Sequence, residues 1–189
     1  RVIVKNDQEP SIQVLIQDLL REREDGRTFL EESPVKSSGS NGVVERRVQG
    51  IEGHIRAIYL SFQERVNRNV DTREMIVIFI PEYAAYLMNR LEIGRDGKVA
   101  YERVQGKSPT ILGLAFREKV LYKVRFQQKL EKINATWEHG IFVGVRSRSN
   151  ELWIATKGEI IAVRSVRRSP FGHRWGEDNI QWVNRVPWN

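Results

Sequence analysis

The chain of 189 residues contains no cysteine and only three histidines. Disulfides are therefore excluded, and so is a cysteine-ligated zinc site within these residues. His54, His139 and His173 lie far apart and show no metal-ligand spacing, so histidines in ordinary structural surroundings are the simpler interpretation. The longest apolar run, residues 75–80, is too short to span a bilayer, and no targeting segment is visible. We expect no membrane partner.

The chain carries an excess of positive charge. Its 31 Lys and Arg outnumber 24 Asp and Glu, which gives a net charge of +7. Residues 115–175 hold thirteen Lys and Arg against five Glu, so this region alone accounts for the excess. A basic module favours a polyanionic partner, although an ordinary basic surface is the alternative.

Apolar residues recur at steps of three and four through residues 40–66, which predicts a long helix with one buried stripe. The stripe consists of Val44, Val48, Ile51, Ile55, Ile58, Tyr59, Phe62 and Val66. Ser40 or Asn41 would cap this helix, which places Glu45 in its first turn. A lone Glu there usually complements the helix dipole, but the same rigid position also suits a metal ligand.

A second acid, Asp7, follows the apolar residues 2–4 at the predicted end of a buried strand. Open α/β sheets carry their chemistry at this carboxyl edge. The 37 residues between Asp7 and Glu45 hold a helix predicted to begin at Pro10, a short strand predicted at 28–31 and a polar loop at 33–41.

The order of Asp7, the serine-rich loop and SNGVVE ending in Glu45 resembles the second and third acids of the retroviral and retrotransposon integrase family. The later segments GRDGKVAYERVQGKSP, KVLYKV and GIFVGV resemble the connection and the basic C-terminal strands of Copia-type members. The resemblance implies an α/β RNase H-like catalytic core, lacking its first strands, over residues 1–93. A connection would follow at 94–113, then a small all-β SH3-like DNA-binding barrel at 114–170 and a tail at 171–189.

The same resemblance implies DNA integration, meaning 3′-end processing and strand transfer by two-metal phosphoryl transfer. Asp7 and Glu45 would be catalytic ligands of Mg²⁺ or Mn²⁺, which prefer hard oxygen donors. The family's first Asp belongs to an earlier strand, so we expect this segment of a polyprotein to be inactive by itself. The partners implied are element ends, target DNA and further copies of the protein, with synthesis in the cytoplasm and action in the nucleus.

From residue 114 onward the pattern predicts short strands at 119–124, 141–146, 152–156 and 160–166, separated by turn residues. Trp153 is expected in the core, and Trp137 either in the core or on a stacking platform. The cations expected to contact DNA phosphates are Arg46, Arg47, Lys119, Lys123, Arg125, Arg146, Arg148, Arg164, Arg167 and Arg168. Lys119 and Lys123 should share one face of their strand.

Two other functions fit the same residues. The first is a domesticated, non-catalytic protein that binds nucleic acid or chromatin and has kept the integrase scaffold. The second is a general RNase H-like nuclease, which leaves the basic barrel unexplained. An upstream strand that ends in Asp would favour the integrase.

Overall fold

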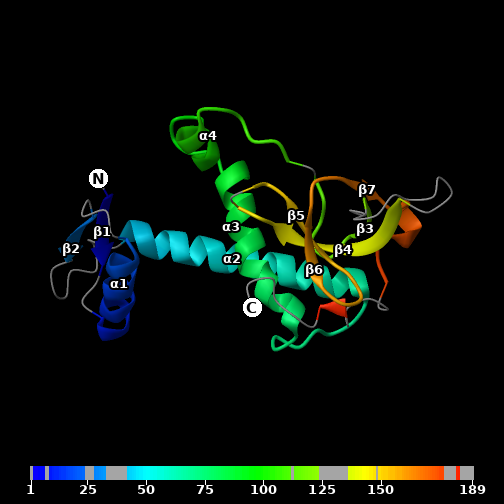
Figure 1. Cartoon of the computed structure of the whole chain (residues 1–189). Helices are drawn as coiled ribbons and strands as arrows, with labels where there is room; N and C mark the ends of the chain where they lie inside the picture. Colours follow the sequence, from blue (N-terminus) through cyan, green and yellow to red (C-terminus); the bar gives the residue numbers. More distant parts are fainter. Residues whose placement is uncertain are drawn as a thin grey trace. The chain divides into compact units, whose positions relative to one another are not determined.

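The computed structural model describes residues 2–6, 9–23, 28–32, 42–111, 113–123, 136–147, 149–176 and 182–183. These residues form helices together with two sheets, so the mixed α/β class is confirmed (Figure 1). The chain divides into two compact units, Arg1–Gly50 and Ile51–Asn189. None of the described helices is long and apolar enough to cross a membrane.

The first unit is built on a strand–helix–strand motif. Strand β1 (Val2–Asn6) pairs in parallel with β2 (Thr28–Glu32), and helix α1 (Pro10–Glu22) connects them. Pro10 stands at the start of α1, as predicted, because proline lacks the N–H that a first turn leaves unbonded. The predicted strand at 28–31 is confirmed as β2. Asp7 lies outside the described residues.

Helix α2 (Gly42–Val66) begins where the sequence predicts, and the division between the two units falls within it. In the second unit, Phe62 and Val66 are buried. In the first unit, Val44 and Val48 are 55% and 48% exposed. The prediction of a stripe buried along the whole helix is therefore wrong for its N-terminal half, where Val44 and Val48 remain exposed.

Three shorter helices lie between α2 and the C-terminal sheet, and a 3₁₀ turn, η3 (Phe171–His173), follows that sheet. A 3₁₀ turn, η2 (Met75–Ile78), leads into α3 (Phe79–Leu91), which has Pro81 in its first turn. Helix α4 (Ala100–Gln105) lies in the stretch 94–113, for which the sequence predicts a connection. Its C-cap Gly106 has φ +68°, a left-handed conformation that favours glycine.

The C-terminal half forms an antiparallel sheet with the strand order β6-β5-β4-β3-β7. Its strands are β3 (Lys119–Lys123), β4 (Trp137–Val145), β5 (Leu152–Ala155), β6 (Ile160–Val163) and β7 (Val166–Arg168). The single strand predicted at 160–166 is therefore two strands, which occupy opposite edges of the sheet. Strand β4 also begins earlier than predicted and includes Trp137.

The short link between β6 and β7 forces the sheet to curl. In a flat sheet, four inter-strand spacings of about 4.8 Å would separate the two edge strands by about 19 Å. Val163 and Val166 are only three residues apart, a span of at most about 11 Å. A register shift between Phe142 and Gly144 increases the local bending. Gly140 permits close approach at the curve, since a Cβ there would lie 2.3 Å from Ile154 Cγ2.

One apolar core joins this curved sheet to α2 and α3 within the second unit. Tyr83 of α3 makes edge or tilted ring contacts with Phe116 and Phe142, at centroid distances of 5.9 and 5.5 Å. Phe62 of α2 contacts Phe116 at 5.8 Å. Trp153 packs against this core, as predicted. The helices and the sheet therefore stabilise each other and form one folded unit.

Candidate nucleic-acid interface

The predicted cations of β3 and β7 separate onto two faces of the sheet. Alternation along β3 leaves Val120 and Tyr122 buried, whereas Lys119 is half-buried and Lys123 is exposed. The two lysines therefore share the outward face, as predicted. Directly paired residues of antiparallel strands also share a face. Lys123 pairs with Trp137, and Leu121 pairs with His139 and with Arg167.

These pairings define a basic face that consists of Lys119, Lys123, Trp137, His139 and Arg167. The Arg167 guanidinium lies 4.3 Å from the centroid of the Trp137 ring, an arrangement that holds a long side chain in place. Trp137 is thus half-exposed beside two cations instead of in the core. At the described positions of β3, β4 and β7 on this face, no Asp or Glu offsets the positive charge.

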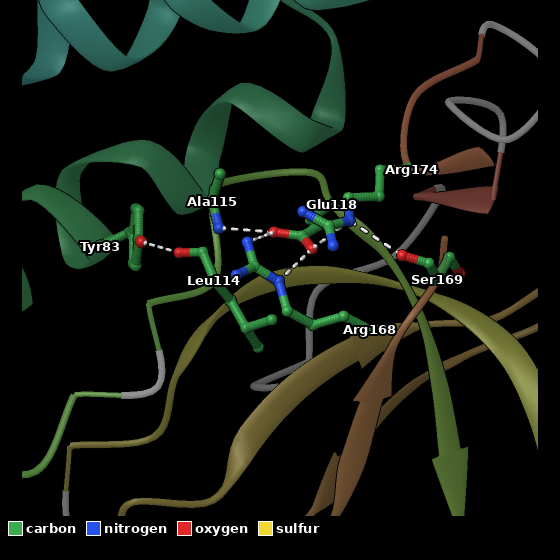
Figure 2. Close-up of polar contacts among 7 residues, drawn as sticks. All are labelled: Tyr83, Leu114, Ala115, Glu118, Arg168, Ser169 and Arg174. Carbon is green, nitrogen blue, oxygen red and sulfur yellow. Dashed lines mark hydrogen bonds and ion pairs between the residues drawn. The ribbon is translucent and has the colours of Figure 1, made fainter. Parts of the chain in front are cut away.

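Arg168 lies on the other face, because it pairs with the buried Val120. Its Nε and Nη2 donate to the two carboxylate oxygens of Glu118 at 2.6 and 2.7 Å, as Figure 2 shows. Ala115 N also donates to this carboxylate at 3.1 Å, and Arg174 Nε lies 3.6 Å from it. Glu118 is fully buried. The Arg168–Glu118 pair therefore connects β7 to the turn before β3. The predicted contact of Arg168 with DNA stays a prediction.

The position of Glu118 explains its ionisation. Burial alone would raise the pKa of its carboxyl, but the Arg168 hydrogen bond, the Ala115 N–H and the charges of Arg168 and Arg174 outweigh burial. The pKa is lowered overall, so the buried group stays charged. The same neighbourhood holds α3 in place, since Tyr83 donates its hydroxyl to Leu114 O at 2.7 Å (Figure 2). Nothing in the spacing of the sequence indicated this cluster.

Two further predicted cations meet at Glu151, a buried residue just before β5. Arg146 Nη1 and Arg164 Nε lie 3.5 and 3.3 Å from its carboxylate oxygens, and Ser149 donates to it at 3.0 Å. The Arg164 side chain is nonetheless 81% exposed. Arg146 and Arg164 together exceed the charge of Glu151 by one, so this corner of the sheet also remains positive. Arg125 and Arg148 lie outside the described residues.

The predicted catalytic residues belong to the first unit. Glu45 is exposed in the first turn of α2, where the sequence places it. Arg46 and Arg47 follow it and are also exposed, and Arg46 Nε donates to Gly42 O at 3.1 Å. Over the described ranges, no group of three or more His, Asp or Glu side chains is placed to hold a metal ion. Asp7 is not among those residues, so its pairing with Glu45 stays a prediction.

A comparison with protein-family models gives no match for this chain, and a comparison with curated proteins gives none either.

Proposed function

We propose that the chain is the C-terminal part of an integrase of the retrotransposon type, with a DNA-binding barrel in its second unit. The observation that carries the DNA-binding part is the basic face, where Lys119, Lys123 and Arg167 point outward beside the half-exposed Trp137. Cations on a sheet surface contact the phosphate backbone without reading sequence. An aromatic ring among them offers stacking to an unpaired base.

The topology supports the SH3-like assignment. In the order β6-β5-β4-β3-β7, strands β3 to β6 form a meander of four strands. Strand β7 follows β6 in the chain and returns to pair with β3. The two-residue link between β6 and β7 curls this meander toward closure. A small barrel built this way presents the outward residues of β3, β4 and β7 on a rigid surface.

The first unit supports the assignment to an RNase H-like core. Parallel strands occur almost only in sheets with both faces covered. Here Ile3, Phe29 and Leu30 of β1 and β2 are 56%, 48% and 46% exposed, and Leu15 of α1 is 68% exposed. We propose that this strand–helix–strand unit packs against further strands and helices of a larger α/β core. Asp7 and Glu45 would then bind Mg²⁺ or Mn²⁺ at its edge, and the function would be DNA 3′-end processing and strand transfer.

Binding of a fluorescent DNA duplex, followed by anisotropy over a series of salt concentrations, tests the DNA-binding part. We expect the logarithm of the affinity to fall linearly with the logarithm of the salt concentration. The double variant K123Q/R167Q should reduce the slope by about two, roughly one for each phosphate that is no longer neutralised. The control R73Q/R95Q removes two exposed arginines outside the sheet and should change the slope much less. Equal effects of the two double variants would reject the basic face as the interface.

The second candidate is a non-catalytic protein that binds nucleic acid or chromatin, and the same basic face supports it equally well. The two candidates differ in the first unit, because only the integrase requires Asp7 and Glu45 to share a metal ion.

A further inference from the structure

A cavity of about 300 Å³ lies within the second unit, away from the basic face. Helices α3 and α4, the segment after α4, and the ends of β4 and β5 enclose it. The polar residues that line it include Tyr86, Arg90, Tyr101, Lys107, Thr110 and Asn150. The described residues that line this cavity thus include two cations and several hydroxyl or amide groups, but no Asp or Glu.

Arg90 is the central group of this cavity. It is only 9% exposed, and its guanidinium lies 4.0 Å from the Tyr86 ring centroid and 4.5 Å from that of Tyr101. The two rings come from α3 and α4, so they hold the guanidinium between two helices. Stacking covers the faces of a guanidinium and leaves its N–H groups for hydrogen bonds. An arginine fixed in this way needs little reorganisation to bind an anion.

Asn150 binds the edge of the Arg90 guanidinium and so orients it between the two tyrosine rings. Arg90 Nη2 donates to Asn150 Oδ1 at 2.7 Å. Asn150 has φ +55°, which asparagine tolerates better than most residues, and its N–H donates to Arg146 O at 2.9 Å. The β4–β5 turn therefore presents Oδ1 in a fixed position. That bond uses one of the five N–H groups of arginine.

Lys107 adds a second positive charge at the exposed side of the cavity, and Ser108 and Thr110 follow it along the same wall. Ser108 Oγ donates to Glu102 Oε1 at 2.6 Å, so this hydroxyl is already used. A planar arginine that donates from its edge, an exposed lysine and the Thr110 hydroxyl together suit an oxyanion with several acceptor oxygens. The volume is several times that of one water molecule, so there is room for a tetrahedral anion together with the group that carries it.

We propose that this cavity binds a terminal phosphate monoester, with Arg90 and Lys107 as its cationic contacts. A recessed site admits the end of a chain more readily than the continuous backbone of a duplex. The same phosphate chemistry comes from two sources, the phosphorylated end of a nucleic-acid strand or a free nucleotide. Only the first source rests on the function proposed above, since it would place a DNA end beside the barrel.

The test measures binding of paired ligands that differ in one phosphate. The pairs are a 5′-phosphorylated and a 5′-hydroxyl single-stranded oligonucleotide, and adenosine monophosphate and adenosine. Inorganic phosphate is titrated separately. We expect the phosphorylated member of at least one pair to bind about tenfold more tightly, the effect of one charge-assisted contact. Preference in the oligonucleotide pair identifies a strand end as the ligand, and preference confined to the mononucleotide pair identifies a free nucleotide.

Two variants connect this preference to the cavity. Lys107→Gln removes the exposed cation, and Asn150→Asp keeps an acceptor for Arg90 while neutralising its charge. Both should reduce the preference to about twofold or less, because each lowers the net positive charge of the cavity by one. Lys98→Gln changes an exposed lysine outside the cavity and should keep the preference. Thermal unfolding of each variant checks that the fold is retained.

The proposal is overturned if neither pair shows a preference for phosphate, or if the preference survives both cavity variants. The Tyr86–Arg90–Tyr101 stack would then only join α4 to α3. Failure here is separable from failure of the DNA-binding proposal. If the chain binds duplex DNA through the basic face but does not prefer phosphorylated ends, only the proposal about the cavity fails. If the chain binds adenosine monophosphate but not duplex DNA, only the proposal about the DNA-binding interface fails.

Discussion

Glu118 shows how a single residue determines which arginines remain for a partner. It is fully buried, and Arg168 binds both of its oxygens. Removing one member of a buried pair leaves the other desolvated and uncompensated. We expect Glu118→Gln to lower the free energy of unfolding by about 2–3 kcal/mol at neutral pH, less than for a fully enclosed pair because Arg168 is partly exposed. Urea unfolding followed by tryptophan fluorescence measures this loss.

The effect of Glu118 on stability should depend on pH with a definite sign. The pKa of its carboxyl in the folded protein lies below the ordinary value of 4.5. Its contribution is therefore complete above that value and is lost as the pH falls toward the lowered pKa. The difference in stability between the wild type and Glu118→Gln should shrink over this acidic range. Glu52→Gln, at an exposed position on α2, is the control. A difference that stays constant with pH would contradict the assigned role.

At the scale of elements, the two halves of α2 should respond differently to the loss of apolar groups. Phe62 is 1% exposed in the core of the second unit, so Phe62→Ala should cost about 3–5 kcal/mol. Val48 is 48% exposed, and Val48→Ser should change stability by less than about 0.5 kcal/mol. All five tryptophans lie in the second unit, so their fluorescence measures the loss at Phe62. Val48 lies in the first unit, so far-ultraviolet circular dichroism, which reports the helices of both units, measures the effect of Val48→Ser. A large effect of Val48→Ser would show that the N-terminal half of the stripe is covered.

Most of the elements could be predicted from the sequence because their signals are local. Pro10 marks the start of α1, the spacing of apolar residues marks α2, and alternation marks β3. The division of 160–166 into two strands is different. The residues on both sides of Arg164 favour a strand, and only the pairing of β6 with β5 and of β7 with β3 separates them. Pairing is a long-range property that a local pattern does not contain.

The same distinction applies to the candidate sites. Alternation correctly predicted that Lys119 and Lys123 share a face, but the predicted strand ended at 166, so the rule was not applied to Arg167 and Arg168. That separation follows from cross-strand pairing with Leu121 and Val120. The cavity around Arg90 was not predicted for a similar reason, because its lining brings residues 86–110 together with residues 145–152, which are distant in sequence.

At the scale of the whole molecule, the two units carry different chemical groups. The second unit carries the excess of positive charge and the basic face. The first unit carries Glu45, and the sequence places Asp7 before α1. The retrotransposon-integrase assignment requires these two acids to hold one metal ion, whereas a non-catalytic nucleic-acid-binding protein does not. The metal is therefore what distinguishes the two functions.

The most direct measurement is a titration with Mn²⁺, with the free ion followed by electron paramagnetic resonance. We expect weak but saturable binding to the wild type, which Asp7→Asn and Glu45→Gln each reduce about tenfold or more, since each removes a charged oxygen ligand. The double variant should be little worse than either single variant, because both residues serve one site. Glu52→Gln, two turns further along α2, should bind Mn²⁺ as the wild type does. Unchanged Mn²⁺ binding in Asp7→Asn and Glu45→Gln would contradict the integrase assignment.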